Sequence, residues 1–309
     1  MGPRGNLLEM DAILLENITK NFGAVRAVDV LSVRVPAGSI YGFLGPNGAG
    51  KTTTLRMIMN IIYPDSGRIE VLGKTPAARA KERIGYMPEE RGLYRKMTVR
   101  AVLAYFGAIK GMKQSNLVRA IPKWLEMMGL TDWANRKVEE LSRGMQQKLQ
   151  FVATVIADPE ILILDEPFSG LDPVNLDLLK GLIVGMRDAG KTVLFSTHIM
   201  EQAEKLCDFI LLINKGRKVL DGTLDQIRSR YEANAVTAEL EGDTSFIADL
   251  PMVKSVTHDG RRLEILLKEN GDSQELLRAL VGGVRVRTFE EKVPSLHEIF
   301  VHLVGQSHE

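Results

Sequence analysis

A single glycine-rich stretch constrains the fold of this chain more than any other segment. It reads Gly45-Pro46-Asn47-Gly48-Ala49-Gly50-Lys51-Thr52, which is the pattern G-x-x-x-x-G-K-[ST]. A strand-like run, Ser39–Leu44, precedes it, and apolar residues at helical spacing from Leu55 to Ile62 follow it. Glycines let successive backbone N–H groups point into one concavity, and the helix adds its positive N-terminal end. The stretch predicts a phosphate-binding loop, with a plain glycine-rich turn as the less specific alternative.

Two side chains at the end of this loop have distinct predicted roles. Lys51 supplies a full positive charge for the β- and γ-phosphates of a nucleotide. The hydroxyl of Thr52 is placed to ligate the Mg²⁺ that accompanies them. The residues predicted to contact the nucleotide here are Gly45, Pro46, Asn47, Gly48, Ala49, Gly50, Lys51, Thr52 and Thr53.

Composition sets the class of protein and excludes some partners. A chain of 309 residues usually forms two domains, and 45% apolar with 26% charged residues is typical of a soluble globular protein. Lys+Arg 40 against Asp+Glu 39 leaves no overall positive field, so no nucleic-acid partner is predicted. The single cysteine, Cys207, cannot form an internal disulfide, which fits a reducing cytoplasm. No apolar run approaches the ~18 residues of a membrane span, so any membrane component belongs to another chain.

A second chemical signal is an apolar run that ends in two acids. Ile161–Leu164 reads as a parallel strand buried on both faces, and Asp165 and Glu166 follow at its carboxyl end. Open α/β sheets bind ligands at that end of their strands. We therefore expect Asp165 to complete the Mg²⁺ shell opposite Thr52, and Glu166 to act as the general base for an attacking water. The alternative is a pair of acids in a solvated turn.

Three further candidates carry weaker signals. Phe22 lies ahead of the loop and could stack on a purine or anchor a turn, and residue type leaves the two about even. Ser142 and Gly144 at a helix start could form a second small anion site, although Ser-x-Gly before a helix is usually only a cap. His198 follows the strand Lys191–Ser196 and could reach a γ-phosphate, although a lone histidine is more often structural.

The rest of the chain gives the domain organisation. The pattern is helical from Thr98 to Leu141, an insertion in an α/β protein, and Pro122 is expected to start or kink its second helix. The predicted divisions are a flexible leader at 1–11, a first domain at 12–222 and a second at 223–309. Short strands and helices alternate in the second, which predicts helices on one face of an antiparallel sheet. Its sequence leaves regulation, dimerisation and partner contact equally open.

Taken together, these motifs in this order resemble the ATP-binding subunit of an ATP-binding-cassette (ABC) transporter over about Ala12 to Thr223. The resemblance implies a P-loop NTPase of the α/β class, with a mixed sheet core, a helical signature subdomain at about 94–150, an antiparallel β subdomain and a small C-terminal α+β domain. The implied motifs are Walker A (Gly45–Thr52), Walker B (Ile161–Asp165) with Glu166 as catalytic carboxylate, the adenine-stacking Phe22, the signature Leu141–Met145, the D-loop Ser169–Asp172 and the switch histidine His198.

The resemblance also implies partners and cofactors. Ser142 and Gly144 would bind the γ-phosphate of a nucleotide held by a second subunit, a copy or a paralogue, so that two ATP molecules lie in a head-to-tail dimer. ATP and Mg²⁺ are the implied cofactors. A separate transmembrane permease would be driven through the Glu89–Lys96 loop and the helical insertion, which places the chain in the cytoplasm, peripheral on the cytoplasmic face of the membrane.

Two departures from the family pattern are informative. Glu89 stands where the family usually has Gln; an anion there can ligate Mg²⁺ but repels the γ-phosphate more than an amide does. In the signature, Arg143 and Met145 replace Gly and Gln. Together with Arg91–Tyr94 and a tail of Pro294–Phe300, these changes resemble a branch of exporter ATPases similar to bacterial sodium-extrusion systems. The resemblance does not identify the transported substrate.

Three other classes are weighed against this interpretation. Soluble ABC ATPases of translation carry two cassettes, and those of chromosomes insert a long coiled coil before the signature, whereas this chain has one cassette and no sustained heptads there. A kinase of another P-loop class would leave Ser142-Arg143-Gly144 without a purpose. A nucleotide-sensing scaffold would bind ATP without turnover.

Overall fold

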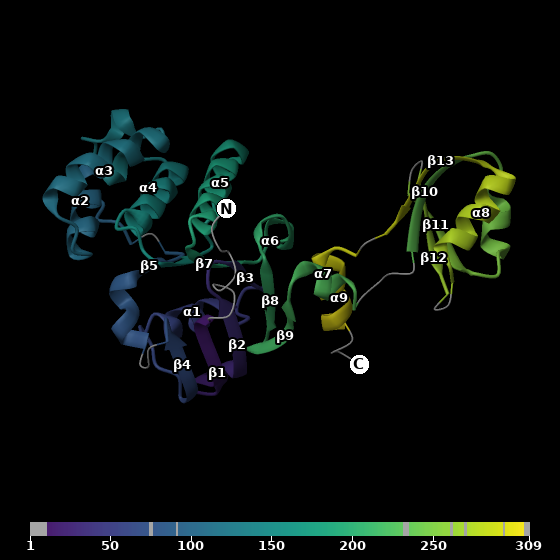
Figure 1. The fold of residues 1–309 in the computed structure, drawn as a ribbon, viewed down its shortest axis with the longest axis horizontal. Coiled ribbons are helices and arrows are strands. Elements are labelled where there is room, and N and C mark those ends of the chain that lie inside the picture. The colour runs from purple at the N-terminus through teal and green to yellow at the C-terminus, as the bar shows by residue number, and fades with distance from the viewer. Residues whose placement is uncertain are drawn as a thin grey trace, which may run out of the picture. The chain divides into compact units, whose positions relative to one another are not determined.

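The computed structural model describes residues 11–73, 77–90, 92–230, 235–259, 262–268, 271–292 and 294–305. The chain divides into two compact units, residues 1–224 and 225–309 (Figure 1). Residues 1–10 of the predicted leader and Arg91 of the predicted permease-contacting loop lie outside the described residues. Asp11, the last residue of that leader, opens the first strand.

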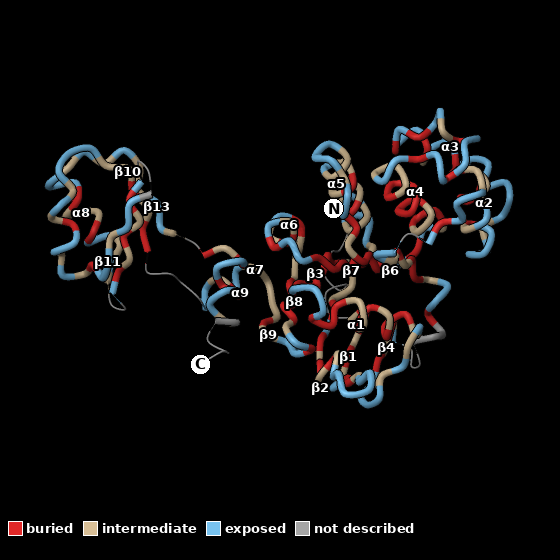
Figure 2. The backbone as a smooth tube through the Cα atoms, turned by 180° about the vertical axis from the view of Figure 1, so that it is seen from behind, coloured by how far each residue is buried: buried red, intermediate tan, exposed pale blue. Residues whose placement is uncertain are grey.

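The centre of the first unit is a six-stranded sheet in the order β5-β6-β7-β3-β8-β9. Its strands are β3 (Ile40–Leu44), β5 (Ile84–Met87), β6 (Ile161–Asp165), β7 (Thr192–Thr197), β8 (Phe209–Asn214) and β9 (Arg217–Gly222). All neighbours are parallel except β8 and β9. Every residue of β3, β6 and β7 is buried, as expected for parallel strands covered on both faces (Figure 2). The carboxyl ends of these three strands therefore meet at one edge.

A second sheet, in the order β2-β1-β4, is antiparallel. Its strands are β1 (Asp11–Phe22), β2 (Val25–Pro36) and β4 (Ser66–Val71). The first two are longer than their apolar patterns predict, because ladder hydrogen bonds continue to a turn at Gly23, which adopts a φ of 58°. Helix α1 (Lys51–Ile58) shares one buried core with both sheets, in which Leu55 packs with Ile13 and Phe43. That core fixes the position of the glycine-rich loop between β3 and α1.

The predicted helical insertion is α2 (Val99–Ile109) and α3 (Gln114–Met127), followed by α4 (Arg143–Val155), and these helices gather together in Figure 1. Pro122 does not start the second helix; it lies inside α3. The apolar face of Leu117, Ile121 and Leu125 is buried, and its packing offsets the hydrogen bond that proline cannot make. The remaining helices of this unit are α5 (Pro173–Asp188) and α6 (Met200–Leu206), of which α6 was not anticipated.

The second unit is a small α+β domain, as predicted. Its antiparallel sheet has the order β11-β12-β10-β13, and Leu276 and Leu280 of α8 pack into one core with Ile265. Its elements are α7 (Leu224–Arg228), β10 (Ala235–Glu241), β11 (Val253–Asp259), β12 (Arg262–Leu267), α8 (Ser273–Gly283), β13 (Arg285–Glu291) and α9 (Leu296–Gly305).

Short 3-10 helices span Ala77–Arg83, Thr131–Trp133, Val138–Glu140 and Ser245–Asp249. Among the described residues, no helix combines the length and apolar character that a bilayer crossing requires.

Candidate functional site

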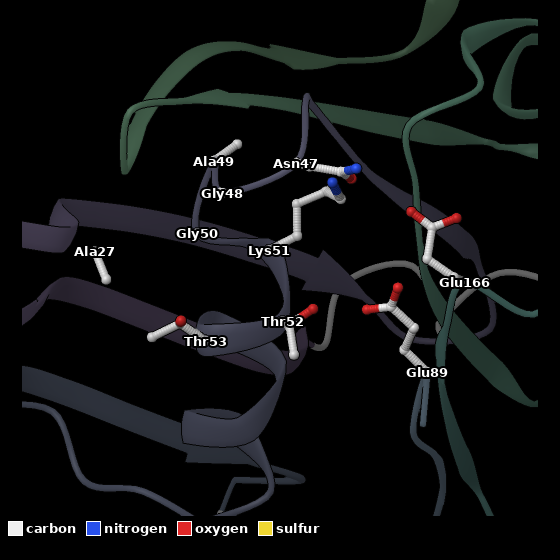
Figure 3. Close-up of a pocket in the computed structure, with 10 residues that line it drawn as sticks. All are labelled: Ala27, Asn47, Gly48, Ala49, Gly50, Lys51, Thr52, Thr53, Glu89 and Glu166. Atoms are coloured by element: carbon white, nitrogen blue, oxygen red, sulfur yellow. The ribbon is translucent and has the colours of Figure 1, made fainter. Parts of the chain in front are cut away.

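A cleft of about 470 Å³ lies at the carboxyl ends of β3, β5 and β6. It is lined by Ala27, Asn47, Gly48, Ala49, Gly50, Lys51, Thr52, Thr53, Glu89 and Glu166. Figure 3 shows the carboxylates of Glu89 and Glu166 pointing toward Lys51 and Thr52 from the opposite side of the cleft. The structure thus brings the glycine-rich loop together with two acids that are remote from it in the sequence.

The loop conformation depends on glycine at two positions. Gly45 has a φ of 151°, and a Cβ built there would lie 2.2 Å from the backbone oxygen of Ile213. Gly50 has a φ of 105°, and its Cβ would lie 2.4 Å from the backbone oxygen of Ala27. Any side chain would push the loop away from the neighbouring strands, so only glycine allows α1 to begin directly at Lys51.

Lys51 is buried at this loop and lies within the electrostatic reach of three acids. Its Nζ donates hydrogen bonds to the backbone oxygens of Gly45 (2.7 Å) and Pro46 (3.1 Å). Burial lowers the pKa of the Lys51 ammonium, and the negative charges of Glu166, Asp165 and Glu89 oppose that shift. Because one ammonium faces three carboxylates, a polyphosphate entering this cleft would need a further cation to balance its charge.

The donor groups that Mg²⁺ prefers are present beside Lys51. Thr52 Oγ1 donates to Asp165 Oδ1 at 3.2 Å, and Ser196 donates to the same oxygen. Asp165 is only 1% exposed, and its Oδ2 has no hydrogen-bond partner in the described part of the chain. A buried carboxylate oxygen without a partner costs free energy, which a hard divalent cation would offset. The described residues contain no group of three or more His, Cys, Asp or Glu able to hold a metal.

Glu166 and His198 form a contact pair across neighbouring strands. Glu166 Oε1 lies 2.9 Å from His198 Nδ1, and the Glu166 backbone N–H donates to Ser196 Oγ at 3.0 Å. Glu166 adopts a φ of 50°, a left-handed conformation that a non-glycine residue takes only where its surroundings hold it. Its side chain is 11% exposed against 50% for His198. The pair can hold a carboxylate ready to accept a proton from water.

The other predicted residues do not line this cleft. Ser142 is exposed, and its Oγ accepts a hydrogen bond from the Met145 N–H as the N-cap of α4. A Cβ built on Gly144 would meet its nearest atom at 3.5 Å, so packing within the chain does not require glycine there. Phe22 is half-exposed, and Lys20 Nζ lies 5.7 Å from the centre of its ring. From that hairpin the structure places Ala27, rather than Phe22, in the cleft wall.

Several residues of the site were not found from the sequence. Ala27 carries no chemical signal, and Ser196 reads only as the end of a strand. Gln147 of α4 is buried, and its Nε2 donates to the backbone oxygens of Glu166 (3.4 Å) and Pro167 (3.0 Å). These contacts join segments that are distant in the chain, so no local pattern reports them.

Comparison with known proteins identifies the family. The model of the ABC transporter family matches residues 28–169, and that of the ATP-binding protein DrrA1-3-like C-terminal domain matches residues 222–304. The uncharacterized ABC transporter ATP-binding protein YhaQ of Bacillus subtilis is 42% identical over 299 residues, which cover 96% of this chain and 100% of that protein. This chain is an ABC transporter ATP-binding subunit. The predicted family is therefore confirmed, and the subunit carries a DrrA-like C-terminal domain.

Two further relatives support this placement of the ABC subunit. Nod factor export ATP-binding protein I of Rhizobium sp. (strain N33) is 35% identical, covering 96% of this chain and 98% of that protein. A solved structure of the ATP-binding subunit of an ABC transporter superposes with a TM-score of 0.67 at 28% identity, covering 71% of this chain and 93% of the other. The predicted P-loop NTPase fold is confirmed. As a member of this family the subunit binds ATP, belongs to the ABC ATPases and works with a separate membrane permease.

Proposed function

We propose that this subunit is an Mg²⁺-dependent ATPase that energises export by a separate permease on the cytoplasmic face of a membrane. In this proposal residues 12–222 form the nucleotide-binding domain and residues 223–309 the accessory domain. The main support for the magnesium requirement is the hydrogen bond between Thr52 and Asp165. The buried Oδ2 of Asp165 has no hydrogen-bond partner in the described part of the chain. The name of the Nod factor export relative supports the direction of transport.

The polar residues at and near the cleft have distinct roles in this proposal. Thr52, Asp165 and Glu89 would hold Mg²⁺, which supplies neutralising charge to the β- and γ-phosphate oxygens when it is bound. The loop N–H groups and Lys51 bind the phosphates, with Lys51 exchanging its contacts to Gly45 and Pro46 for phosphate oxygens. Glu166 accepts the proton of the attacking water, and His198 orients the Glu166 carboxylate.

Removal of divalent cations tests the metal requirement directly. We expect release of phosphate from ATP by the purified chain to fall to background in excess EDTA and to return when Mg²⁺ is added in excess. The reason is that three carboxylates near the phosphate site repel the polyphosphate unless a cation screens them. Asp165→Asn should weaken the response to Mg²⁺, because an amide oxygen is a poorer ligand than a carboxylate. Full hydrolysis in EDTA would contradict the proposal.

A surface for the permease is proposed beside the cleft. A largely apolar groove of about 270 Å³ is lined by residues of β5, α2 and α4 and of the loop between β5 and α2, among them Leu93 and Phe106. Tyr94 and Tyr105 stand next to one another, with ring centres 5.1 Å apart and hydroxyls 3.2 Å apart. Both rings are exposed, as is Ile109, which is unusual for a cluster of large apolar side chains. We propose that a cytoplasmic segment of the permease covers this groove.

Co-purification tests this surface. We expect the chain to be recovered with its permease from solubilised membranes, and Tyr94→Glu together with Tyr105→Glu to reduce that recovery about tenfold, since charge would have to be desolvated in an apolar contact. Val281→Glu, which alters an exposed apolar residue of α8, is the control and should leave recovery unchanged. ATP binding by each purified variant should match wild type. Undiminished recovery of the double variant would rule out this face.

Two copies of the nucleotide-binding domain, identical or paralogous, are proposed to close on ATP. Ser142 and Gly144 do not line the chain's own cleft, and they lie together at the start of α4. The exposed Ser142 hydroxyl at that helix start supports its contact with a phosphate of a facing subunit. Closing and opening would follow from ATP binding preferentially to the closed state.

A further inference from the structure

Helix α4, whose first turn carries the signature residues, has three glutamines that each donate to two backbone oxygens. Gln146 Nε2 reaches Val138 (3.2 Å) and Leu141 (3.0 Å), which lie in the segment before α4. Gln147 and Gln150 reach out of the helical insertion to the two loops that carry acids of the cleft. All three side chains donate hydrogen bonds to backbone oxygens, but each side chain binds a different segment of the chain.

Gln150 holds the loop on both sides of Glu89. Its Nε2 donates to the backbone oxygen of Pro88 at 2.8 Å and to that of Glu90 at 3.3 Å. The carbonyls on either side of one residue are thereby fixed to a helix, which limits the directions that the Glu89 side chain can take. Glu89 itself is exposed at the cleft, so packing does not orient it.

The burial of Gln150 has a cost that packing does not explain. Its side chain is 4% exposed, and its Oε1 has no partner among the residues that the structure describes. A buried acceptor left unpaired is unfavourable, so an apolar residue of similar size would be preferred if filling space were the only requirement. What glutamine adds here is the pair of donors to the Glu89 loop.

Gln147 makes the matching contact on the other acid loop. It lies one helical turn before Gln150, is 4% exposed, and donates to the backbone oxygens of Glu166 and Pro167. One helix of 13 residues, α4, therefore follows its N-cap Ser142 and holds the loop backbones that carry both cleft carboxylates, Glu89 and Glu166.

We propose that Gln150 is a positioning residue that sets Glu89 for the metal, and that α4 links the start of the signature helix to both cleft acids through Gln150 and Gln147. The inference rests on the proposed magnesium role of Glu89. Any displacement of Ser142 by a facing subunit would then be transmitted to Glu89 and Glu166 together, because the three are attached to the same helix.

The test measures the Mg²⁺ concentration that gives half-maximal ATP hydrolysis at a fixed, saturating ATP concentration. In Gln150→Met we expect this concentration to rise about fivefold. A change of that size corresponds to the net free energy that one hydrogen bond typically contributes. Gln150→Leu also removes the donors and has a similar volume, so it should show the same shift even if the methionine variant folds poorly. Glu89→Gln should shift the same quantity, and combining it with Gln150→Met should add no further shift, since both act through one ligand.

Gln146→Met is the matched control, because it also loses two bonds to backbone oxygens on the same helix but touches neither acid loop. It should leave the half-maximal Mg²⁺ concentration within about twofold of wild type, as expected for a site with no shared partner. The inference is overturned if Glu89→Gln shifts the Mg²⁺ requirement while both Gln150 variants do not. If Glu89→Gln itself causes no shift, this inference and the metal role of Glu89 both fall, whereas EDTA-sensitive hydrolysis would still support the ATPase assignment.

Discussion

Replacing Glu166 by Gln is expected to lower the rate of ATP hydrolysis by about 10²–10⁴-fold, the usual contribution of a positioned general base. The carboxylate lines the cleft opposite Lys51, and His198 Nδ1 holds one of its oxygens at 2.9 Å. Glutamine fills the same space but cannot accept the proton of the attacking water. ATP binding should be retained, because we propose that the loop and Lys51 make the phosphate contacts. Phosphate release and binding of a fluorescent ATP analogue, measured on the same preparation, separate the two effects.

The control for this experiment lies at the opposite end of the same strand. Glu160 immediately precedes β6, and its carboxylate pairs with the exposed Arg83 guanidinium. Glu160→Gln removes a surface ion pair that contributes at most about 1 kcal/mol, so hydrolysis should stay near wild type. A Glu166→Gln variant that hydrolyses ATP at the wild-type rate would refute the assignment of Glu166 as the base.

Replacing Ser142 by Arg is expected to abolish ATP-dependent dimerisation. The hydroxyl lies exposed at the start of α4, and a long side chain there would fill the space in which we place the phosphate of the facing subunit. The change is best made in the Glu166→Gln background, where slow hydrolysis would let an ATP-bound dimer accumulate. Size exclusion with light scattering, run with and without ATP, measures the dimer.

A separate cap controls for damage to the helix. Thr98 caps α2 by accepting a hydrogen bond from the Ala101 N–H, as Ser142 does for α4 from Met145. Loss of either cap should cost about 1 kcal/mol of stability, but Thr98→Arg alters a helix start that we do not place at the dimer contact. It should therefore dimerise on ATP as the parent does. Persistence of the ATP-dependent dimer in Ser142→Arg would exclude the head-to-tail sandwich.

The parts of the fold that the sequence predicts are local. The loop from Gly45 to Thr52 can be predicted because the strand, the glycines and the helix start are contiguous in the sequence. At two of its positions the backbone conformation also requires glycine. The strand Ile161–Asp165 can be predicted because a strand buried on both faces consists almost entirely of apolar residues. Of the two expectations for Pro122, the helix start is wrong: a local rule places proline at a helix start, but the buried apolar face of α3 continues the helix through it.

Which distant groups meet follows only from the folded chain. Thr52 and Asp165 are 113 residues apart, yet they share a hydrogen bond because β6 and β3 end at the same edge of one sheet. Packing likewise brings Gln150 and Gln147 of α4 to the loops that carry Glu89 and Glu166. The sequence around a helical glutamine does not indicate which distant residue it will contact. The glycine-rich loop, the acidic strand end and the family can be predicted without the structure, because they depend on short contiguous patterns. The placement of the acids around the cleft depends on long-range contacts that arise only when the chain is folded.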